Sequence, residues 1–184
     1  MMPKSITVGE LLNNEHYVQV TGDEKSLERP IYVAEINRPG FELAGFFKHS
    51  DFRRIIIFGD KESAFINEMS EERQREIFPF LINDEVPCII VAKGNECPAI
   101  LIEIARKKDF PIFITESATG RVSIELTNIL DEALAPETLI HGVFLNIYGK
   151  GVIIKGDSGI GKSEIALELV KRGHLLAVSY THLR

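Results

Sequence analysis

The chain has 184 residues, of which 45% are hydrophobic and 26% are charged, so it has enough apolar material to bury a globular core. Its formal net charge of −6 disfavours both nucleic acid and anionic membranes as partners, although a net charge does not exclude a local basic patch. The apolar runs are strand-length and the amino terminus lacks the apolar stretch of a secretory signal, so we expect a cytoplasmic protein that does not span a membrane.

The first two thirds of the sequence alternate between segments typical of strands and of helices. Ser5 and Thr7 can cap a short helix, and apolar residues recur at helical spacing after Ser70, after Pro98 and over residues 118–135. Strand-like runs lie at residues 17–20, 31–33, 53–58, 88–92 and 111–115. This order predicts a small α/β layer with a partly parallel sheet.

Two smaller features of this region have structural interpretations. Cys88 and Cys97 fit neither a metal-ligand spacing nor a disulfide framework, and Cys88 opens an apolar run, which predicts a small buried hydrophobic residue. The charged run over residues 68–76 is typical of a solvated helix face.

Pro136 is expected to end the helix over residues 118–135. We therefore place a domain boundary within residues 130–136, which gives an N-terminal α/β domain (residues 1–133) and a second, partial domain (residues 134–184). Beyond the boundary, two strand-like runs at residues 138–148 and 150–155 are predicted to form a hairpin with its turn at Gly149-Lys150.

Residues 156–163 read GDSGIGKS and fit the P-loop pattern G-x-x-x-x-G-K-[ST]. Glycines allow backbone N–H groups to surround phosphate oxygens, and the helix that follows points its positive end at the same phosphates. An apolar, β-branched run precedes the motif and a helical pattern follows it, as a P-loop requires. The candidate nucleotide-binding residues are Gly156, Asp157, Ser158, Gly159, Ile160, Gly161, Lys162 and Ser163, with ATP and Mg²⁺ as the expected ligands.

The P-loop alone does not name a reaction, but its surroundings carry a family resemblance. His141-Gly142-Val143, Tyr148-Gly149 and the run GDSGIGKSEIALELVKRGH, which ends at His174, closely resemble the bacterial HPr kinase/phosphorylase family. The resemblance extends more weakly into the N-terminal region and covers about residues 3–174.

The resemblance implies a concrete function. Enzymes of this family use ATP and magnesium to phosphorylate a serine of the phosphocarrier protein HPr, and so regulate carbohydrate metabolism. They reverse the reaction by phosphorolysis, in which inorganic phosphate attacks phosphoserine and pyrophosphate is formed. Their P-loop domain is similar to phosphoenolpyruvate carboxykinase, and they assemble as homohexamers.

The resemblance also implies roles for three residues. Lys162 matches the catalytic P-loop lysine, Ser163 matches the magnesium ligand, and His141 matches the family's active-site histidine. A histidine at a strand edge is, on its own, more often structural or solvated, and only the resemblance favours a role at the phosphates. Asp157 and Glu164 flank the motif and are assigned no catalytic role, since a solvated or helix-N-terminal position is the default for both.

The sequence departs from the family pattern after His174. The family continues through a short apolar strand into a pair of aspartates, one of which exchanges the serine proton, but residues 175–180 read LLAVSY. We therefore expect a truncated member of the family that lacks kinase activity itself, with residues 178–184 as a candidate non-native tail. The alternatives are a regulatory module that binds nucleotide without transferring phosphate, and an interaction protein with a vestigial P-loop.

Overall fold

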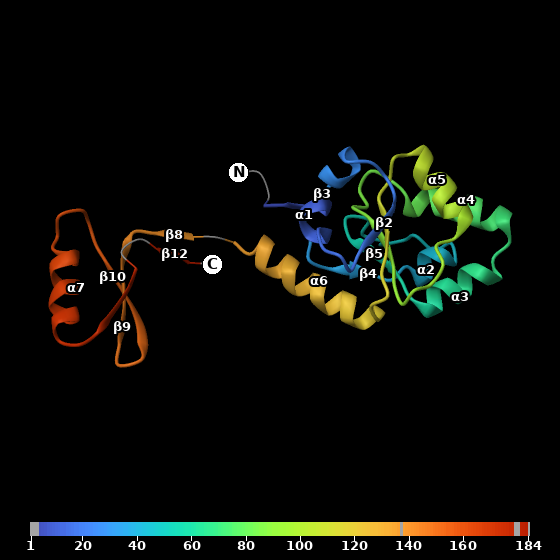
Figure 1. Ribbon diagram of the computed structural model, residues 1–184. Coiled ribbons are helices and arrows are strands. Elements are labelled where there is room, and N and C mark those ends of the chain that lie inside the picture. Colours follow the sequence, from blue (N-terminus) through green and yellow to red (C-terminus); the bar gives the residue numbers. More distant parts are fainter. Residues whose placement is uncertain (1–3, 137, 179–180, 184) are drawn as a thin grey trace. The chain divides into compact units, whose positions relative to one another are not determined.

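The computed structural model describes residues 4–136, 138–178 and 181–183. The chain divides into two compact units, Met1–Leu134 and Ala135–Arg184, which we call the N-terminal unit and the P-loop unit. The helices and strands of both units are labelled in Figure 1. Residues 179, 180 and 184 of the candidate non-native tail lie outside the described residues.

The N-terminal unit is built on a five-stranded sheet with the strand order β2-β7-β6-β5-β4. Strands β4 to β7 run parallel to their neighbours, and β2 pairs with β7 antiparallel. The strands are β2 (Val18–Thr21), β4 (Ile36–Asn37), β5 (Ile55–Phe58), β6 (Ile89–Val91) and β7 (Ile112–Ile114), and a separate pair is formed by β1 (Ile6–Thr7) and β3 (Pro30–Ile31). The predicted partly parallel α/β layer is confirmed.

Helices cover both faces of this sheet, because its central strands are apolar on both sides. In β5, Ile56 and Phe58 face one cluster of buried residues, while Ile55 and Ile57 face another, as the alternation of side chains along a strand requires. The helices are α1 (Val8–Leu12), α2 (Gly40–Leu43), α3 (Asp60–Glu68), α4 (Glu71–Leu81), α5 (Ala99–Lys107) and α6 (Thr119–Leu134), with a 3-10 helix, η1, at Lys25–Glu28.

The two buried clusters are contributed by different helices. Helices α2, α3, α4 and α5 supply residues to the cluster around Phe58, and α1 and α6 supply residues to the cluster around Ile57. In α6, Val122, Leu126 and Leu130 are buried at the spacing expected for one face of a helix. Figure 1 shows α6 and α1 on one side of the sheet strands and α3, α4 and α5 on the other.

Two of the helix caps that the sequence predicted, at Thr7 and Ser70, are present in the structure. Thr7 and Glu10 form a reciprocal capping box on α1, and the Ser70 side chain accepts a hydrogen bond from the Arg73 N–H at the start of α4. The charged run over residues 68–76 is not one helix face, because α3 ends at Glu68 and α4 begins at Glu71. The sequence analysis missed α3, whose start is marked by the Glu62 carboxylate accepting from the Gly59 N–H.

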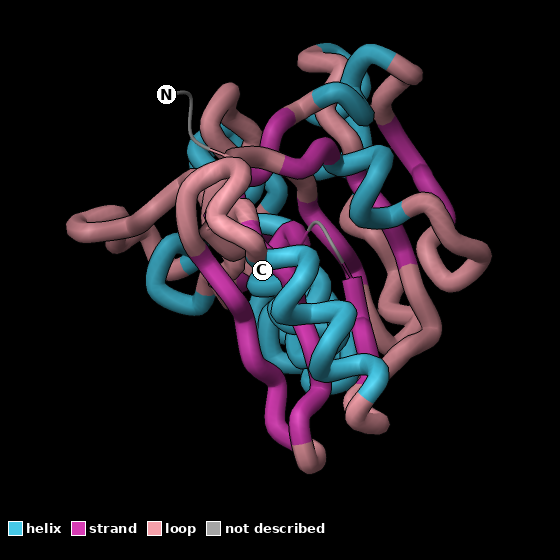
Figure 2. The backbone as a smooth tube through the Cα atoms, turned by 90° about the vertical axis from the view of Figure 1, so that its left-hand side faces the viewer, coloured by secondary structure: helices cyan, strands magenta, loops and turns pink. Residues whose placement is uncertain are grey.

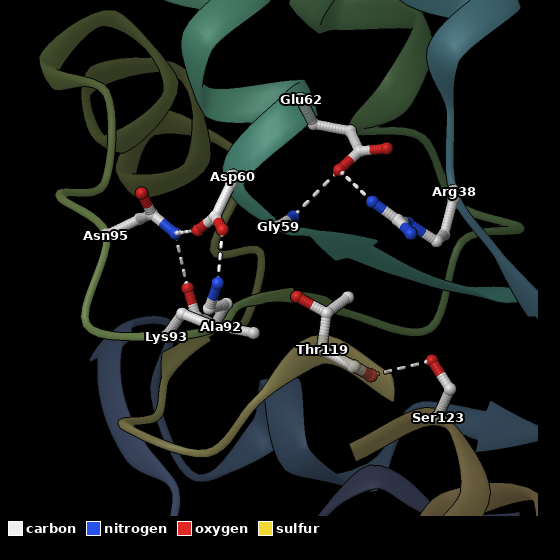
Figure 3. A network of polar contacts seen from close by, with 9 residues as sticks. All are labelled: Arg38, Gly59, Asp60, Glu62, Ala92, Lys93, Asn95, Thr119 and Ser123. Atoms are coloured by element: carbon white, nitrogen blue, oxygen red, sulfur yellow. Dashed lines mark hydrogen bonds and ion pairs between the residues drawn. The ribbon is translucent and has the colours of Figure 1, made fainter. Parts of the chain in front are cut away.

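A polar network ties together the loops that follow β5 and β6 (Figure 3). Glu62 Oε2 accepts hydrogen bonds from Arg38 Nη2 at 2.7 Å and from the Gly59 N–H at 2.9 Å. Asp60 forms an ion pair with Lys93 and accepts a hydrogen bond from Asn95 Nδ2 at 3.2 Å. The carboxyl edge of the sheet, where α/β proteins commonly bind ligands, is therefore occupied by the unit's own ion pairs.

Both cysteines are free, and Cys88 is fully buried. Its burial among apolar side chains raises the pKa of the thiol well above its usual range. Burial also raises the pKa of Cys97 to about 12. The prediction of a buried hydrophobic role for Cys88 is confirmed, since a protonated thiol is neither a nucleophile nor a metal ligand.

In residues 138–178 and 181–183, the P-loop unit contains one helix and two small antiparallel sheets. Its three-stranded sheet has the order β10-β9-β11, and β8 pairs with β12. The elements are β8 (Thr138–Ile140), β9 (Gly142–Ile147), β10 (Lys150–Lys155), α7 (Lys162–Lys171), β11 (Leu175–Val178) and β12 (Thr181–Leu183). The predicted single run over residues 138–148 is thus two strands that are separated at His141.

The turn of the β9–β10 hairpin lies one residue earlier than predicted. Lys150 pairs with Ile147, so the two turn residues are Tyr148 and Gly149, not Gly149 and Lys150. Both have positive φ, 51° and 80°, as a two-residue type I′ turn requires. The hairpin can be followed in Figure 2, where both strands are magenta.

Candidate nucleotide-binding site

The register of the β9–β10 hairpin brings His141 to the P-loop. Gly142, the first residue of β9, pairs with Lys155, the last residue of β10. The residues just beyond this pair are His141 on one side and Gly156, the first P-loop residue, on the other. His141 and Gly156, fifteen positions apart in the sequence, are therefore neighbours across the end of the hairpin.

Gly142 is required by the close approach of the two strands. A Cβ atom on Gly142 would lie 2.8 Å from the Ile154 carbonyl oxygen and 2.9 Å from Ile153 Cγ2. Backbone cannot move aside cheaply at such a distance, so any side chain at this position pushes β9 away from β10. The glycine next to His141 thus sets how closely the histidine approaches the P-loop.

The P-loop itself adopts the conformation that its glycines permit. Gly159 and Gly161 have φ values of 84° and 94°, in the left-handed region that favours glycine. Gly161 is also the N-cap residue of α7, so the helix begins at Lys162 and the first-turn N–H groups face the loop. Phosphate groups are stabilised at such a helix start by free N–H donors and by the helix dipole.

A cavity of about 800 Å³ lies over this loop. It is lined by His141, Gly142, Val143, Gly156, Asp157, Ser158, Gly159, Gly161, Lys162, Ser163 and Glu164. Ile160 is the one predicted binding residue that does not line it, and its side chain is 66% exposed. The structure therefore brings His141, Lys162 and Ser163 to one cavity.

The Lys162 ammonium group bends back over the P-loop. Its Nζ donates hydrogen bonds to the carbonyl oxygens of Gly156 at 2.9 Å and Asp157 at 2.6 Å. This conformation places the positive charge within the curve of the loop, where phosphate oxygens are expected. The carbonyl contacts hold the side chain in position, because a lysine side chain otherwise has many rotamers to choose from.

Three residues line the cavity that the sequence analysis did not include among the site residues: Gly142, Val143 and Glu164. The register of the β9–β10 hairpin brings Gly142 and Val143 to the cavity. This register was not predicted, because the turn was predicted one residue too late. Glu164 lies in the first turn of α7, and its Oε2 lies 3.0 Å from the position of a Cβ atom on Gly161. Its nearness to Ser163 in the sequence was the available signal.

Metal-ligating groups are sparse at the cavity. Within residues 4–136, 138–178 and 181–183, no cluster of three or more His, Cys, Asp or Glu side chains could hold a metal ion by itself. The Ser163 hydroxyl is an oxygen donor of the kind that Mg²⁺ accepts, and magnesium in nucleotide sites takes most of its ligands from phosphate and water. The donor set fits a metal that arrives with a nucleotide.

Comparison with known proteins identifies the family. Residues 6–130 match the family described as "HPr Serine kinase N terminus", and residues 132–179 match "HPr Serine kinase C-terminal domain". The chain belongs to the HPr serine kinase family. The resemblance expected from the P-loop and its surroundings is confirmed, and so is an α/β fold with an N-terminal unit followed by a unit of the family's C-terminal domain.

Curated relatives carry one name. Proteins called "HPr kinase/phosphorylase" from Bacillus cereus (strain AH820) and Bacillus mycoides (strain KBAB4) are each 41% identical to this member of the HPr serine kinase family over 175 residues. A protein of the same name from Bacillus anthracis (strain A0248) is 40% identical over 175 residues. These alignments cover 95% of this chain and 56% of each relative, so the chain spans little more than half the length of the relatives it matches.

Throughout the part of the chain that the structure describes, no helix is both long enough and apolar enough to cross a membrane.

Proposed function

We propose that the P-loop unit binds ATP with Mg²⁺ and that the chain serves the HPr kinase/phosphorylase reaction. The observation that supports this most directly is the cavity shared by His141, Lys162 and Ser163 at the start of α7. The names of the curated relatives support ATP-dependent phosphorylation of a serine in HPr as the reaction. They favour an enzyme over a non-catalytic module.

The residues of the cavity have distinct proposed roles. Lys162 neutralises the β- and γ-phosphates, and the Ser163 hydroxyl ligates the magnesium ion that accompanies them. Backbone N–H groups of residues 156–163 hold the phosphate oxygens. His141 lines the same cavity as Gly156, and its proposed role is to donate a hydrogen bond to a phosphate oxygen, in the forward reaction or in phosphorolysis, where inorganic phosphate enters and pyrophosphate leaves.

Transfer to a serine hydroxyl needs a group that accepts its proton within hydrogen-bond reach. Residues 169–184 contain no Asp or Glu. Asp157 and Glu164 line the cavity but flank the phosphate-binding loop itself. We propose that the full-length family protein supplies the proton acceptor. We also propose that it assembles into hexamers and lies in the cytoplasm, and that its two domains meet near Pro136.

The experiment that tests nucleotide binding is equilibrium dialysis of the 184-residue chain with labelled ATP, with Mg²⁺ and then with a chelator in its place. We expect saturable binding that weakens when magnesium is removed and when His141 is replaced by alanine. His16→Ala, which changes an exposed histidine of the N-terminal unit, is the matched control. Binding that ignores both magnesium and His141 would contradict the proposal.

A phosphotransfer assay tests the reaction. The chain is incubated with γ-labelled ATP, Mg²⁺ and HPr, and the label on HPr is measured. Since residues 169–184 contain no Asp or Glu, we expect ATP binding without transfer by this chain and transfer by a relative of full length. Label on the serine of HPr would show that residues 1–184 already hold the proton acceptor.

A further inference from the structure

The backbone of the β9–β10 turn gives no reason for a tyrosine at position 148. Tyr148 has a φ of 51° at the first turn position, where Asn, Asp and Gly are favoured. A bulky residue in the left-handed region is uncommon and costs backbone free energy. A residue kept in an unfavourable conformation is expected to have a side-chain role that offsets the cost.

The Tyr148 side chain makes an aromatic contact with His174. The two ring centroids are 4.7 Å apart and the ring planes meet at 78°, an edge-to-face arrangement. Such pairs are favourable because the positive edge of one ring meets the negative face of the other. Tyr148 is otherwise 90% exposed, so this contact is not a by-product of burial in the core.

His174 lies where α7 ends and the chain turns toward the sheet. Gly173 has a φ of 93°, its N–H donates to the Val170 carbonyl at 2.9 Å, and the His174 N–H donates to the Leu169 carbonyl at 3.1 Å. These bonds close the helix in the manner of a Schellman motif. The next residue, Leu175, begins β11 and pairs with Asn146 of β9.

The contact therefore fastens the carboxyl end of α7 to the tip of the β9–β10 hairpin. Few side chains of the helix are packed, since within the described residues Ala166 is the buried residue of α7 and Leu169 packs partly against the small core. The amino end of α7 is held by the P-loop, which carries Lys162. The hairpin turn and the P-loop lie at opposite ends of the helix in Figure 1.

We propose that Tyr148 and His174 form a clamp that positions α7, and through it Lys162 and Ser163, for nucleotide binding. They are positioning residues, because neither lines the cavity. A helix fixed at one end only can rock against the sheet, and binding phosphate at its start must then remove that motion at an entropic cost. This inference rests on the proposed nucleotide site, and it predicts that contacts at the far end of α7 change ATP affinity.

The test is a set of variants of the 184-residue chain, with the Kd for Mg-ATP as the readout. Tyr148→Asn removes the ring but supplies a residue that the turn favours, so turn strain falls while the clamp is lost. We expect Tyr148→Asn and His174→Ala each to weaken binding about threefold to fivefold, in line with an aromatic pair. Tyr148→Phe keeps the edge-to-face contact and should bind as the unchanged chain does.

The double variant Tyr148→Asn/His174→Ala decides whether the two residues act as a pair. A clamp predicts that the double variant binds no more weakly than either single variant. Equal affinity of Tyr148→Asn and the unchanged chain overturns the proposal, and so does a double variant whose loss is the product of the single losses.

Amide hydrogen exchange at Arg172 and Gly173 gives a readout that does not depend on nucleotide. Tyr148→Asn should accelerate exchange there, and Tyr148→Phe should not. If the unchanged chain shows no saturable ATP binding, the proposed function is wrong. The exchange rates then still test whether Tyr148 and His174 form a clamp. Unchanged exchange in Tyr148→Asn would then overturn it.

Discussion

The two units of this chain bury their apolar residues to very different degrees. In the N-terminal unit, two large clusters fill both faces of the sheet, and the strand residues of β5 and β6 are at most 1% exposed. In the P-loop unit, the fully buried core consists of Val143, Leu145 and Ala166 within the described residues. Apolar side chains of a helix are ordinarily buried against a neighbouring element, yet Ile165 and Leu167 of α7 are 52% and 57% exposed.

The two units differ in what they contribute: the N-terminal unit has the larger core, and the P-loop unit has the candidate site. The N-terminal unit has the packing of a self-sufficient domain, and its polar edge network is satisfied by its own side chains. The P-loop unit has the chemical site but a small core, so its geometry depends on backbone constraints such as the glycines at positions 142, 159 and 161. Substitutions should therefore act through packing in one unit and through backbone conformation in the other.

The largest expected effect is in the packed unit. Phe58→Ala removes a fully buried ring from the interior strand β5 and should destabilise the N-terminal unit by about 3–5 kcal/mol. Leu145→Ala in the small core of β9 should cost about 2 kcal/mol, because that site can collapse more easily. Urea unfolding followed separately in the two units checks this, and an equal cost for both substitutions would remove the contrast between them.

An intermediate effect is expected from the backbone of the P-loop unit. Gly142→Ala places a Cβ atom 2.8 Å from the Ile154 carbonyl oxygen and should cost about 1–3 kcal/mol while also weakening ATP binding. Gly120→Ala is the matched control, since a Cβ atom there meets nothing within 4 Å and lies in α6. We expect the control to be neutral or slightly stabilising. A Gly142→Ala chain with unchanged melting temperature and ATP affinity would show that the close approach is unimportant.

The smallest effect concerns acid stability of the N-terminal unit. Burial alone would raise the pKa of Glu62, but hydrogen bonds from Arg38 and from the Gly59 N–H outweigh it, and the pKa is lowered. A carboxyl with a lowered folded-state pKa stabilises the fold above its unfolded pKa and loses that contribution as pH falls through the folded value. Glu62→Gln should reduce the fall in stability between about pH 5 and pH 3 by less than about 1 kcal/mol, since the Arg38 side chain is 45% exposed. Urea midpoints measured across that range check the sign, which would be opposite if burial dominated.

Much of the N-terminal unit could be predicted because its signals are local. The apolar runs that became β5, β6 and β7 and the caps at Thr7 and Ser70 each depend on a few adjacent residues. Helix α3 was missed because its N-cap is Gly59, which also resembles a turn that ends a strand. Strand β4 is two residues long and is defined only by its pairing with β5.

The P-loop of the candidate site could be predicted from the sequence, but the residues of β9 that line the cavity beside it could not. The P-loop motif fixes the conformation of residues 156–163 through glycine positions, which can be recognised in the sequence. Gly142 and Val143 line the cavity because of the register of the β9–β10 hairpin. That register is set by the position of the turn, which was hard to recognise because its first residue is Tyr148. An aromatic residue at the first position of a type I′ turn runs against ordinary turn preferences.

The most direct test of the central claim compares two neighbouring lysines in Mg-ATP titrations of the 184-residue chain. Lys162 lines the cavity and contacts the P-loop carbonyls, whereas Lys155 precedes the loop and does not line the cavity. The account predicts that Lys162→Ala raises the Kd at least about tenfold and that Lys155→Ala changes it less than about threefold. Equal affinities for the two variants, or no saturable binding by the unchanged chain, would contradict a nucleotide site at the P-loop.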